Sequence, residues 1–311
     1  MPELPANLRH RLLLVRDLDK WGGDDRDLRR RRDKGDLVRV RRGCYLPAAD
    51  WEAMSPRERH LARIHSVAAN ASIEPVFSHV SAAAVHGITM VTTWTDKVHV
   101  TLDPTGARRT QPDIATHALG LETDEIERRD GLLVTGLERT LVDLALTSSF
   151  QSAVVALDWA LAEGVARSDL HAALERRGAV KRGRAAVAAI EFADARSGSA
   201  GESLSRGVMH LLGSRPPELQ VPISDEAGVI GTVDFYWPEQ RIIGEFDGRA
   251  KYERGEYLRG RTPGQVVHEE KVREDRMRAT RRGFVRWGWD GAADPTRLGR
   301  ILRDAGIPGF R

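Results

Sequence analysis

The spacing of apolar positions in the first fifty residues predicts two helices followed by a hairpin. Leucine and valine recur at helical spacing over residues 8–15, and two glycines at 22–23 end this first helix. A second helix begins at Asp24, a favoured N-cap residue, and ends at Gly35. Two runs rich in apolar residues, Leu37–Val40 and Cys44–Leu46, then flank the turn Arg41-Arg42-Gly43, so residues 37–46 are expected to form a β-hairpin.

From residue 51 to residue 196 the pattern is mainly helical, and between residues 151 and 195 turn residues fall only at the joins. Apolar residues fall at helical spacing in four stretches: 55–70, 81–87, 137–146 and 151–195. Two shorter stretches, Lys97–Leu102 and Leu132–Val134, are predicted as strands. The small residues at 197–201 form the clearest linker in the chain. We therefore predict three domains, covering residues 1–50, 51–196 and 197–311.

The last domain is expected to contain a helix, three strands, a helix, a strand and a final helix. The predicted elements of this α-β-β-β-α-β-α order cover residues 200–212, 219–223, 232–237, 242–247, 265–282, 284–289 and 296–305. We expect a multidomain α+β protein with a winged helix at the N-terminus, a mostly helical middle region and an α/β core at the C-terminus.

Acidic residues interrupt the apolar hairpin of this last domain. If the loop Pro238–Arg241 pairs Trp237 with Ile242, Asp234 lies directly opposite Glu245, where like charges are destabilising. Asp247 shares the same face because side chains alternate along a strand. A divalent cation held by these carboxylates would explain their arrangement. The alternative is that they are solvent-facing acids on a half-buried hairpin.

Composition narrows the class of protein. The chain has 311 residues, 41% of them hydrophobic and 30% charged, and a net charge of only +3, so the distribution of charge matters more than its total. The single cysteine, Cys44, excludes an internal disulfide, and we expect it to be a small packed side chain in a reducing compartment. No apolar run approaches a membrane span and the N-terminus lacks signal-peptide character, which favours a soluble cytoplasmic protein.

Arginines gather on the second helix and at the tip of the hairpin. A helix, a basic helix and a basic hairpin follow one another in the order of a winged helix-turn-helix, in which the second helix enters the major groove. We predict DNA contacts from six arginines: Arg29, Arg30, Arg32, Arg39, Arg41 and Arg42. The alternative is a solvated basic helix, since four successive arginines wrap a full helical turn.

The same region resembles the winged-helix antitoxin domain of the abortive-infection antitoxin family of type IV toxin–antitoxin systems. The resemblance rests on the pattern G-x-L-x-R-V-x-x-G-x-Y, which here runs from Gly35 to Tyr45. It covers about the first fifty residues firmly and about the next hundred loosely. It implies DNA binding at a promoter, with a toxin or regulatory protein as a further partner.

The last domain resembles PD-(D/E)xK nucleases of the restriction-endonuclease-like fold, in the branch related to very-short-patch repair endonucleases. The matching residues are Asp234, the run Glu245-Phe246-Asp247-Gly248, and the E-K-x-R-x-D pattern at residues 270–275. The resemblance implies a metal site at Asp234 and Glu245 for Mg²⁺ or Mn²⁺, which would polarise a phosphodiester and activate a water molecule. It also implies that Glu202 orients a metal-bound water or a second cation.

One position departs from this nuclease pattern. The lysine expected two residues after the second acid is replaced by Asp247, so we expect a cation from elsewhere to take its role. Lys251 is nearest along the chain and is the preferred candidate, while Lys271 or His268 could serve instead. The predicted catalytic set is therefore Glu202, Asp234, Glu245, Asp247 and Lys251.

Other polar residues of the middle region carry no recognisable motif. His79, His86, His99 and His117 share no metal-ligand spacing and are interpreted as structural or exposed, and Glu138, Arg139 and Asp143 are interpreted as a surface ion network. Two hypotheses follow: a DNA-binding protein with a metal-dependent endonuclease domain, or a non-enzymatic DNA-binding regulator of the antitoxin type whose last domain is a degenerate nuclease. No phosphate loop, dinucleotide fingerprint or catalytic triad supports a small-molecule enzyme.

Overall fold

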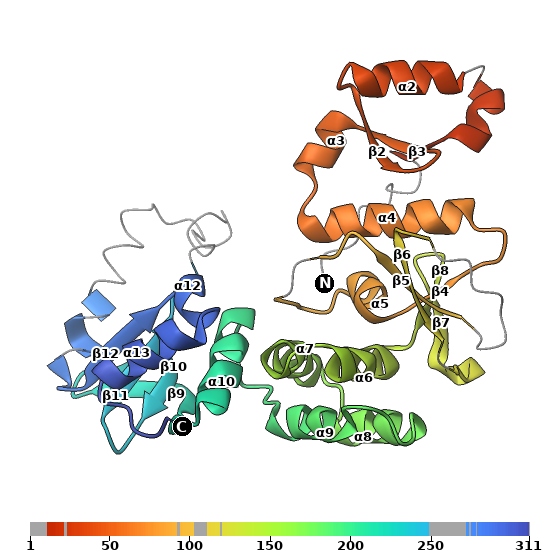
Figure 1. Cartoon of the computed structure of the whole chain (residues 1–311). Coiled ribbons are helices and arrows are strands. Elements are labelled where there is room, and N and C mark those ends of the chain that lie inside the picture. The colour runs from red at the N-terminus through yellow and green to blue at the C-terminus, as the bar shows by residue number, and fades with distance from the viewer. Residues whose placement is uncertain are drawn as a thin grey trace. The chain divides into compact units, whose positions relative to one another are not determined.

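The computed structural model describes residues 11–21, 24–91, 94–102, 111–118, 120–248, 272–273, 275–277 and 279–310 (Figure 1). The chain forms two compact units. The first comprises Met1–Ile88, Thr92–Leu144 and Ala172–Gly178, and the second comprises Thr89–Val91, Ala145–His171 and Ala179–Arg311. This grouping differs from the three domain ranges expected from the sequence, which stay a prediction.

The first unit begins with a small three-stranded sheet that supports a basic helix. Its elements are β1 (Leu13–Leu14), the 3₁₀ helix η1 (Val15–Trp21), α2 (Asp25–Asp33), β2 (Leu37–Arg41), β3 (Cys44–Pro47) and α3 (Ala48–Ala53), with the strand order β1-β3-β2. The helix expected over residues 8–15 is wrong at Leu13–Leu14, which pairs with Tyr45 and Cys44 of β3. A short apolar run fits a strand as well as a helix, and pairing with β3 decides between them.

Helix α2 forms where it was predicted because both of its ends carry the appropriate signals. The Asp24 side chain accepts a hydrogen bond from the Arg26 N–H, so it satisfies one of the free donors of the first turn. At the other end Gly35 has φ of +87°, a left-handed conformation that glycine adopts at no steric cost. One side of α2 buries Leu28 against Leu37 and Tyr45.

A five-stranded sheet forms the larger part of the first unit. Its elements are α4 (Pro56–Asn70), β4 (Val76–Phe77), α5 (His79–His86), β5 (Val98–Leu102), β6 (Ile114–Ala118), the 3₁₀ helix η2 (Thr123–Glu125), β7 (Ile126–Arg129) and β8 (Leu132–Thr135), with the strand order β6-β5-β4-β8-β7. Strands β5 and β8 were predicted. Strands β4, β6 and β7 were missed because they are short and no alternation of buried and exposed residues marks them.

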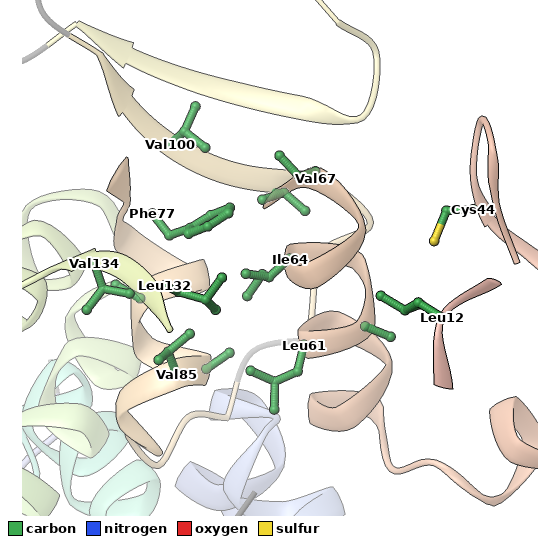
Figure 2. Packing of buried hydrophobic residues seen from close by; sticks show 14 of the residues in the cluster. Leu12, Cys44, Leu61, Ile64, Val67, Phe77, Val85, Val100, Leu132 and Val134 are labelled. Atoms are coloured by element: carbon green, nitrogen blue, oxygen red, sulfur yellow. The ribbon is translucent and has the colours of Figure 1, made fainter. Parts of the chain in front are cut away.

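Helix α4 joins the two sheets of the first unit through one apolar core. Figure 2 shows Leu61, Ile64 and Val67 of α4, with Leu12 and Cys44 of the small sheet to one side and Phe77 of the large sheet to the other. The Cys44 side chain is fully buried, and this burial raises the pKa of its thiol to about 12. Cys44 is therefore an unreactive packed side chain, as expected.

Helices α6 (Leu137–Thr147), α7 (Phe150–Ala162), α8 (Arg167–Arg176) and α9 (Gly183–Phe192) lie where the sequence pattern placed the long helical stretch. The last part of the second unit contains α10 (Ala200–Leu212), β9 (Glu218–Asp225), β10 (Gly228–Trp237), β11 (Ile242–Phe246), β12 (Gly283–Trp287), α12 (Trp289–Ala292) and α13 (Pro295–Asp304). The sheet order is β12-β11-β10-β9, with β12 parallel to β11 and the other pairs antiparallel.

Helices α10 and α13 cover one face of this sheet, as Figure 1 shows, and bury its apolar side chains in a shared core. Gly201 of α10 is required by the close approach of α10 to β11, because a Cβ atom there would overlap the buried ring of Phe246. The chain is thus a mixed α+β protein with three sheets. Within the described residues, the helices and strands expected at 200–212, 219–223, 232–237, 242–247, 284–289 and 296–305 are present with shifted bounds, and α12 is an additional helix. Most of the expected helix at 265–282 lies outside the described residues, so the full predicted order stays a prediction.

Candidate nucleic-acid interface and carboxylate cluster

Three predicted DNA-contacting arginines lie on α2, and each is paired with an aspartate of the same helix. Arg29 Nη2 lies 2.5 Å from Asp25 Oδ2, and Arg30 Nη2 lies 2.6 Å from Asp27 Oδ1. Arg32 Nη2 lies 2.6 Å from Oδ1 of its neighbour Asp33, and this hydrogen bond raises the pKa of the Arg32 guanidinium. Each of the three arginines is therefore paired with a neighbouring carboxylate.

The outer face of α2 also carries an arginine that the sequence analysis missed. Arg26 is exposed and lies one turn before Arg30, so both side chains project from the side opposite the buried Leu28. Among the described residues, the Arg26 guanidinium has neither a hydrogen bond nor an ion pair. The i,i+4 spacing of Arg26 and Arg30 was the signal that could have identified it.

The three arginines of the hairpin β2–β3 have different surroundings. Arg39 and Arg42 are exposed, and within the described part of the chain neither guanidinium is hydrogen-bonded or paired with an acid. Arg41, by contrast, is part-buried and its guanidinium contacts the side chains of Asp113 and Gln111. The structure thus leaves Arg39 and Arg42 available for an anionic ligand, whereas Arg41 ties the hairpin to the segment before β6.

The acidic residues of the last sheet have the strand register that the sequence predicted, but their side chains contact other groups of the protein. Trp237 pairs with Ile242 and Phe235 with Gly244, and continuing this register places Asp234 opposite Glu245. Asp234 Oδ2 accepts a hydrogen bond from the Phe246 main-chain N–H at 2.8 Å, and its Oδ1 lies 3.5 Å from Gln220 Nε2. Asp234 is therefore held against the end of β11.

Glu202 is joined to Asp234 through Gln220. Gln220 Nε2 donates to Glu202 Oε2 at 2.8 Å, and Glu202 also accepts from the Gly198 N–H and the Ser199 hydroxyl. Its carboxylate is 4% exposed and has at least three neutral donors. Ser199 is the N-cap of α10, and these contacts tie the Glu202 carboxylate to the residues at the start of this helix.

Glu245 contacts two arginines. Arg273 Nη2 lies 3.0 Å from its Oε1 and Arg286 Nη2 lies 3.0 Å from its Oε2. Gly231 permits the approach of Arg273, since a Cβ atom there would lie 2.7 Å from Arg273 Nε. Arg273 also donates to the Thr232 carbonyl oxygen at 2.7 Å, so that it links β10 to β11. The charge of Glu245 is therefore compensated within the protein.

These contacts do not fit a Mg²⁺ or Mn²⁺ site. A cation that used Glu245 as a ligand would compete with two guanidinium groups, and the described residues contain no group of three or more His, Cys, Asp or Glu side chains that could hold a metal ion. Asp247 is half-buried, and its main-chain N–H donates to the Trp287 carbonyl oxygen at 2.8 Å. Lys251, Lys271 and His268 lie outside the described residues, so the predicted catalytic set stays a prediction.

A buried polar cluster in the first unit was not recognised from the sequence. The rings of His79 and His117 are stacked with centroids 3.6 Å apart, and His99 Nδ1 lies 3.1 Å from His117 Nε2. His79 is 2% exposed and has φ of +51°, a left-handed conformation that is uncommon outside glycine. Because the rings of His79 and His117 are stacked face to face, their nitrogen atoms lie in parallel planes and do not point toward a common position. The two rings therefore do not converge on a shared metal ion.

Burial makes these histidines neutral. It lowers the pKa of His79 to about 2 and that of His99 to about 4, and the neighbouring imidazoles act in the same direction. The charged groups that face His79 are Arg139 and Asp143 of α6 and Arg177, the residue after α8. The interpretation of His79, His99 and His117 as separate structural or exposed residues missed this cluster, because residues from α5, β5 and β6 come together only in the folded chain.

The neighbouring ion pairs are also buried. Arg139 and Asp143 are 2% and 1% exposed, and Arg139 Nη1 lies 2.8 Å from Glu125 Oε2. The expectation of a surface ion network over Glu138, Arg139 and Asp143 is therefore wrong, and Glu125 takes the place of Glu138. The sequence reveals the i,i+4 spacing of such a pair, but whether the pair is buried depends on how the helix packs against the rest of the protein.

Comparisons with known proteins show that part of this chain is similar to a described family. Residues 76–187 match the model of the AbiEi antitoxin C-terminal domain. The chain is also 34% identical over 172 residues to each of two proteins of Mycobacterium tuberculosis. These are the uncharacterized protein MT2308 of strain CDC 1551 / Oshkosh and the uncharacterized protein Rv2248 of strain ATCC 25618 / H37Rv. The aligned region covers 54% of this chain and 60% of each relative.

Among solved structures, the chain is similar to the RV2827C protein of M. tuberculosis. The TM-score is 0.41 at 19% sequence identity, with 60% of this chain and 73% of that chain covered. Within the described residues, the structure contains no helix long and apolar enough to cross a membrane.

Proposed function

We propose that this protein is a non-enzymatic regulator of the antitoxin type that binds duplex DNA through its N-terminal elements. The observation that carries the proposal is the order of two parts: a basic helix and hairpin lie N-terminal to a region that matches the AbiEi antitoxin C-terminal domain, with α3 and α4 between them. The three-stranded sheet, α2 and the hairpin β2–β3 correspond to the elements of a winged helix, which supports this assignment. A protein toxin is the partner class that the family match suggests.

In this proposal α2 enters the major groove and the β2–β3 turn contacts the DNA backbone. Arg26 and Arg30 occupy the outer face of α2, where guanidinium groups can contact guanine edges or phosphates. Arg39 and Arg42 of the hairpin are exposed and would contact phosphates. Arg29 lies beside this face and would contact the flanking backbone, whereas Arg32 follows the buried Leu28 by one turn and would reach the backbone only from the inner side of the helix.

The test is binding of the full-length protein to fluorescein-labelled duplexes, measured by anisotropy. One duplex carries the region upstream of the protein's own coding sequence and another has a random sequence of the same length. We expect binding to both that weakens with salt, and tighter binding to the upstream duplex. Absence of saturable binding to either duplex by folded protein would contradict the proposal.

A metal-dependent endonuclease is the second candidate, and the register of β10 and β11 favours it because it aligns Asp234 with Glu245. The pairing of Glu245 with Arg273 and Arg286 argues against it. The test is incubation with plasmid and single-stranded DNA in the presence of Mg²⁺, Mn²⁺ or EDTA, beside the variant Asp234→Ala/Glu245→Ala. Metal-dependent cutting that the variant lacks would establish the nuclease, whereas intact DNA under all conditions would eliminate it.

A further inference from the structure

The arginines of α2 form ion pairs with aspartates of the same helix, at different positions around it. Three arginines that the proposed interface offers to DNA are each held by an aspartate of the same helix: Arg29 by Asp25, Arg30 by Asp27 and Arg32 by Asp33. These pairs are solvent-exposed, with side-chain exposures of 62% for Arg29, 69% for Arg30 and 65% for Asp33. Exposed pairs of this kind are readily exchanged for other partners.

Helix stability accounts for two of the aspartates but not for the third. Asp25 and Asp27 lie in the first turn of α2, where a negative charge interacts favourably with the helix dipole. Asp33 is the last residue of α2, where the dipole disfavours a negative charge. A carboxylate at this end of a helix, exposed and beside an arginine, therefore requires another explanation.

We propose that Asp25, Asp27 and Asp33 compete with DNA phosphates for the arginines of α2, and so weaken binding to duplexes of the wrong sequence. This inference rests on the proposed function. On any duplex, each arginine must leave its aspartate, and that aspartate is then brought close to the phosphates. Only a sequence that also offers base contacts to Arg26 and Arg30 offsets this repulsion. The aspartates thus increase selectivity, because contacts with DNA phosphates alone are then not enough for tight binding.

Asp33→Asn is the most informative variant. It removes the negative charge that pairs with Arg32, and at this end of α2 that charge has no favourable interaction with the helix dipole. The control is Asp304→Asn, since Asp304 is exposed and is also the last residue of a helix, α13, and the change in net charge is identical. Both variants and the wild type are titrated with a random-sequence duplex and with the upstream duplex by fluorescence anisotropy. Circular dichroism verifies that each protein is folded.

We expect Asp33→Asn to bind the random duplex about three- to tenfold more tightly than the wild type, as expected for about one additional net phosphate contact. The ratio of affinities for upstream and random duplexes should fall, and Asp304→Asn should behave as the wild type. Equal random-duplex affinities for Asp33→Asn and Asp304→Asn, beside a wild type that binds DNA, would overturn this inference and leave the proposed function standing. No duplex binding by any folded protein would overturn both.

Discussion

Two arginine–aspartate pairs with the same i,i+4 spacing have opposite surroundings in this chain. Arg29 and Asp25 of α2 have side-chain exposures of 62% and 34%, whereas those of Arg139 and Asp143 of α6 are 2% and 1%. An exposed pair of this spacing contributes about 0.3–0.5 kcal/mol to stability, and it exchanges freely with water and other ions. A buried pair has lost its hydration, so removing one partner leaves a charge with no compensation.

The difference in exposure indicates different roles: the exposed pair of α2 can bind a ligand, whereas the buried pair of α6 stabilises the fold. The α2 pair can release its arginine to a phosphate at little expense of free energy. The α6 pair lies in a network with Glu125 and beside the histidine cluster, where Arg139 links α6 to the segment that precedes β7. We therefore expect substitutions in the two pairs to affect different properties, binding in α2 and stability in α6.

The largest effect is expected for Arg139→Met. This variant leaves the buried carboxylates of Glu125 and Asp143 without the guanidinium between them, and we expect it to destabilise the protein by about 3–5 kcal/mol. Urea denaturation followed by circular dichroism measures this loss, with Arg176→Met, which changes an exposed arginine of α8, as the control. A loss below about 1 kcal/mol, similar to that of a surface substitution, would show that the network is not structural.

An intermediate effect is expected from pH. Because the pKa of His79 is about 2 and that of His99 about 4 in the folded protein, the unfolded chain takes up protons below about pH 6.5 that the folded chain does not. Stability is therefore complete above about pH 6.5 and falls on acidification by about 1.4 kcal/mol per pH unit for each such histidine.

The variant His79→Asn isolates this contribution, since asparagine tolerates the left-handed conformation of residue 79. We expect the loss of stability between pH 7 and pH 5 to shrink by about 2 kcal/mol relative to the wild type. His210→Asn, at an exposed position of α10, is the control. Urea titrations at both pH values measure the difference, and an unchanged loss in His79→Asn would contradict the assignment.

The smallest effect on stability is expected for Arg29→Met. Its exposed pair with Asp25 contributes about 0.3–0.5 kcal/mol, so the urea midpoint should move only slightly. The same variant should weaken duplex binding about three- to fivefold at moderate salt, because one phosphate contact is lost. Strong destabilisation by Arg29→Met would contradict the difference in stabilising energy that we expect between the exposed pair of α2 and the buried pair of α6.

The sequence predicted much of the fold because local signals were strong. The capping box at Ser55 and Glu58, the N-cap at Asp24 and the loop between Trp237 and Ile242 all appear as expected. Segments without such signals were missed or mistaken. The strand at Leu13–Leu14 depends on pairing with β3, and β6 lacks alternation of buried and exposed residues.

The candidate sites were predicted less well because they depend on tertiary contacts. The register that aligns Asp234 with Glu245 followed from loop length, but the arginines that neutralise Glu245 come from positions 273 and 286, which no spacing rule connects to it. The same holds for the stack of His79, His99 and His117. Conversely, Arg26 could have been found from its one-turn spacing to Arg30.

The most direct test of DNA binding through the outer face of α2 is the salt dependence of binding by Arg26→Ala/Arg30→Ala to the random-sequence duplex, on which both arginines contact phosphates and not base edges. Each phosphate contact contributes about 0.9 to the slope of log K against log salt concentration, so we expect a slope about 1.8 smaller than that of the wild type, together with weaker binding. The control variant Arg176→Ala/Arg184→Ala removes the same charge from exposed positions of α8 and α9 and should leave the slope unchanged. A slope and an affinity equal to those of the control would contradict the assignment of α2 as the DNA-binding helix.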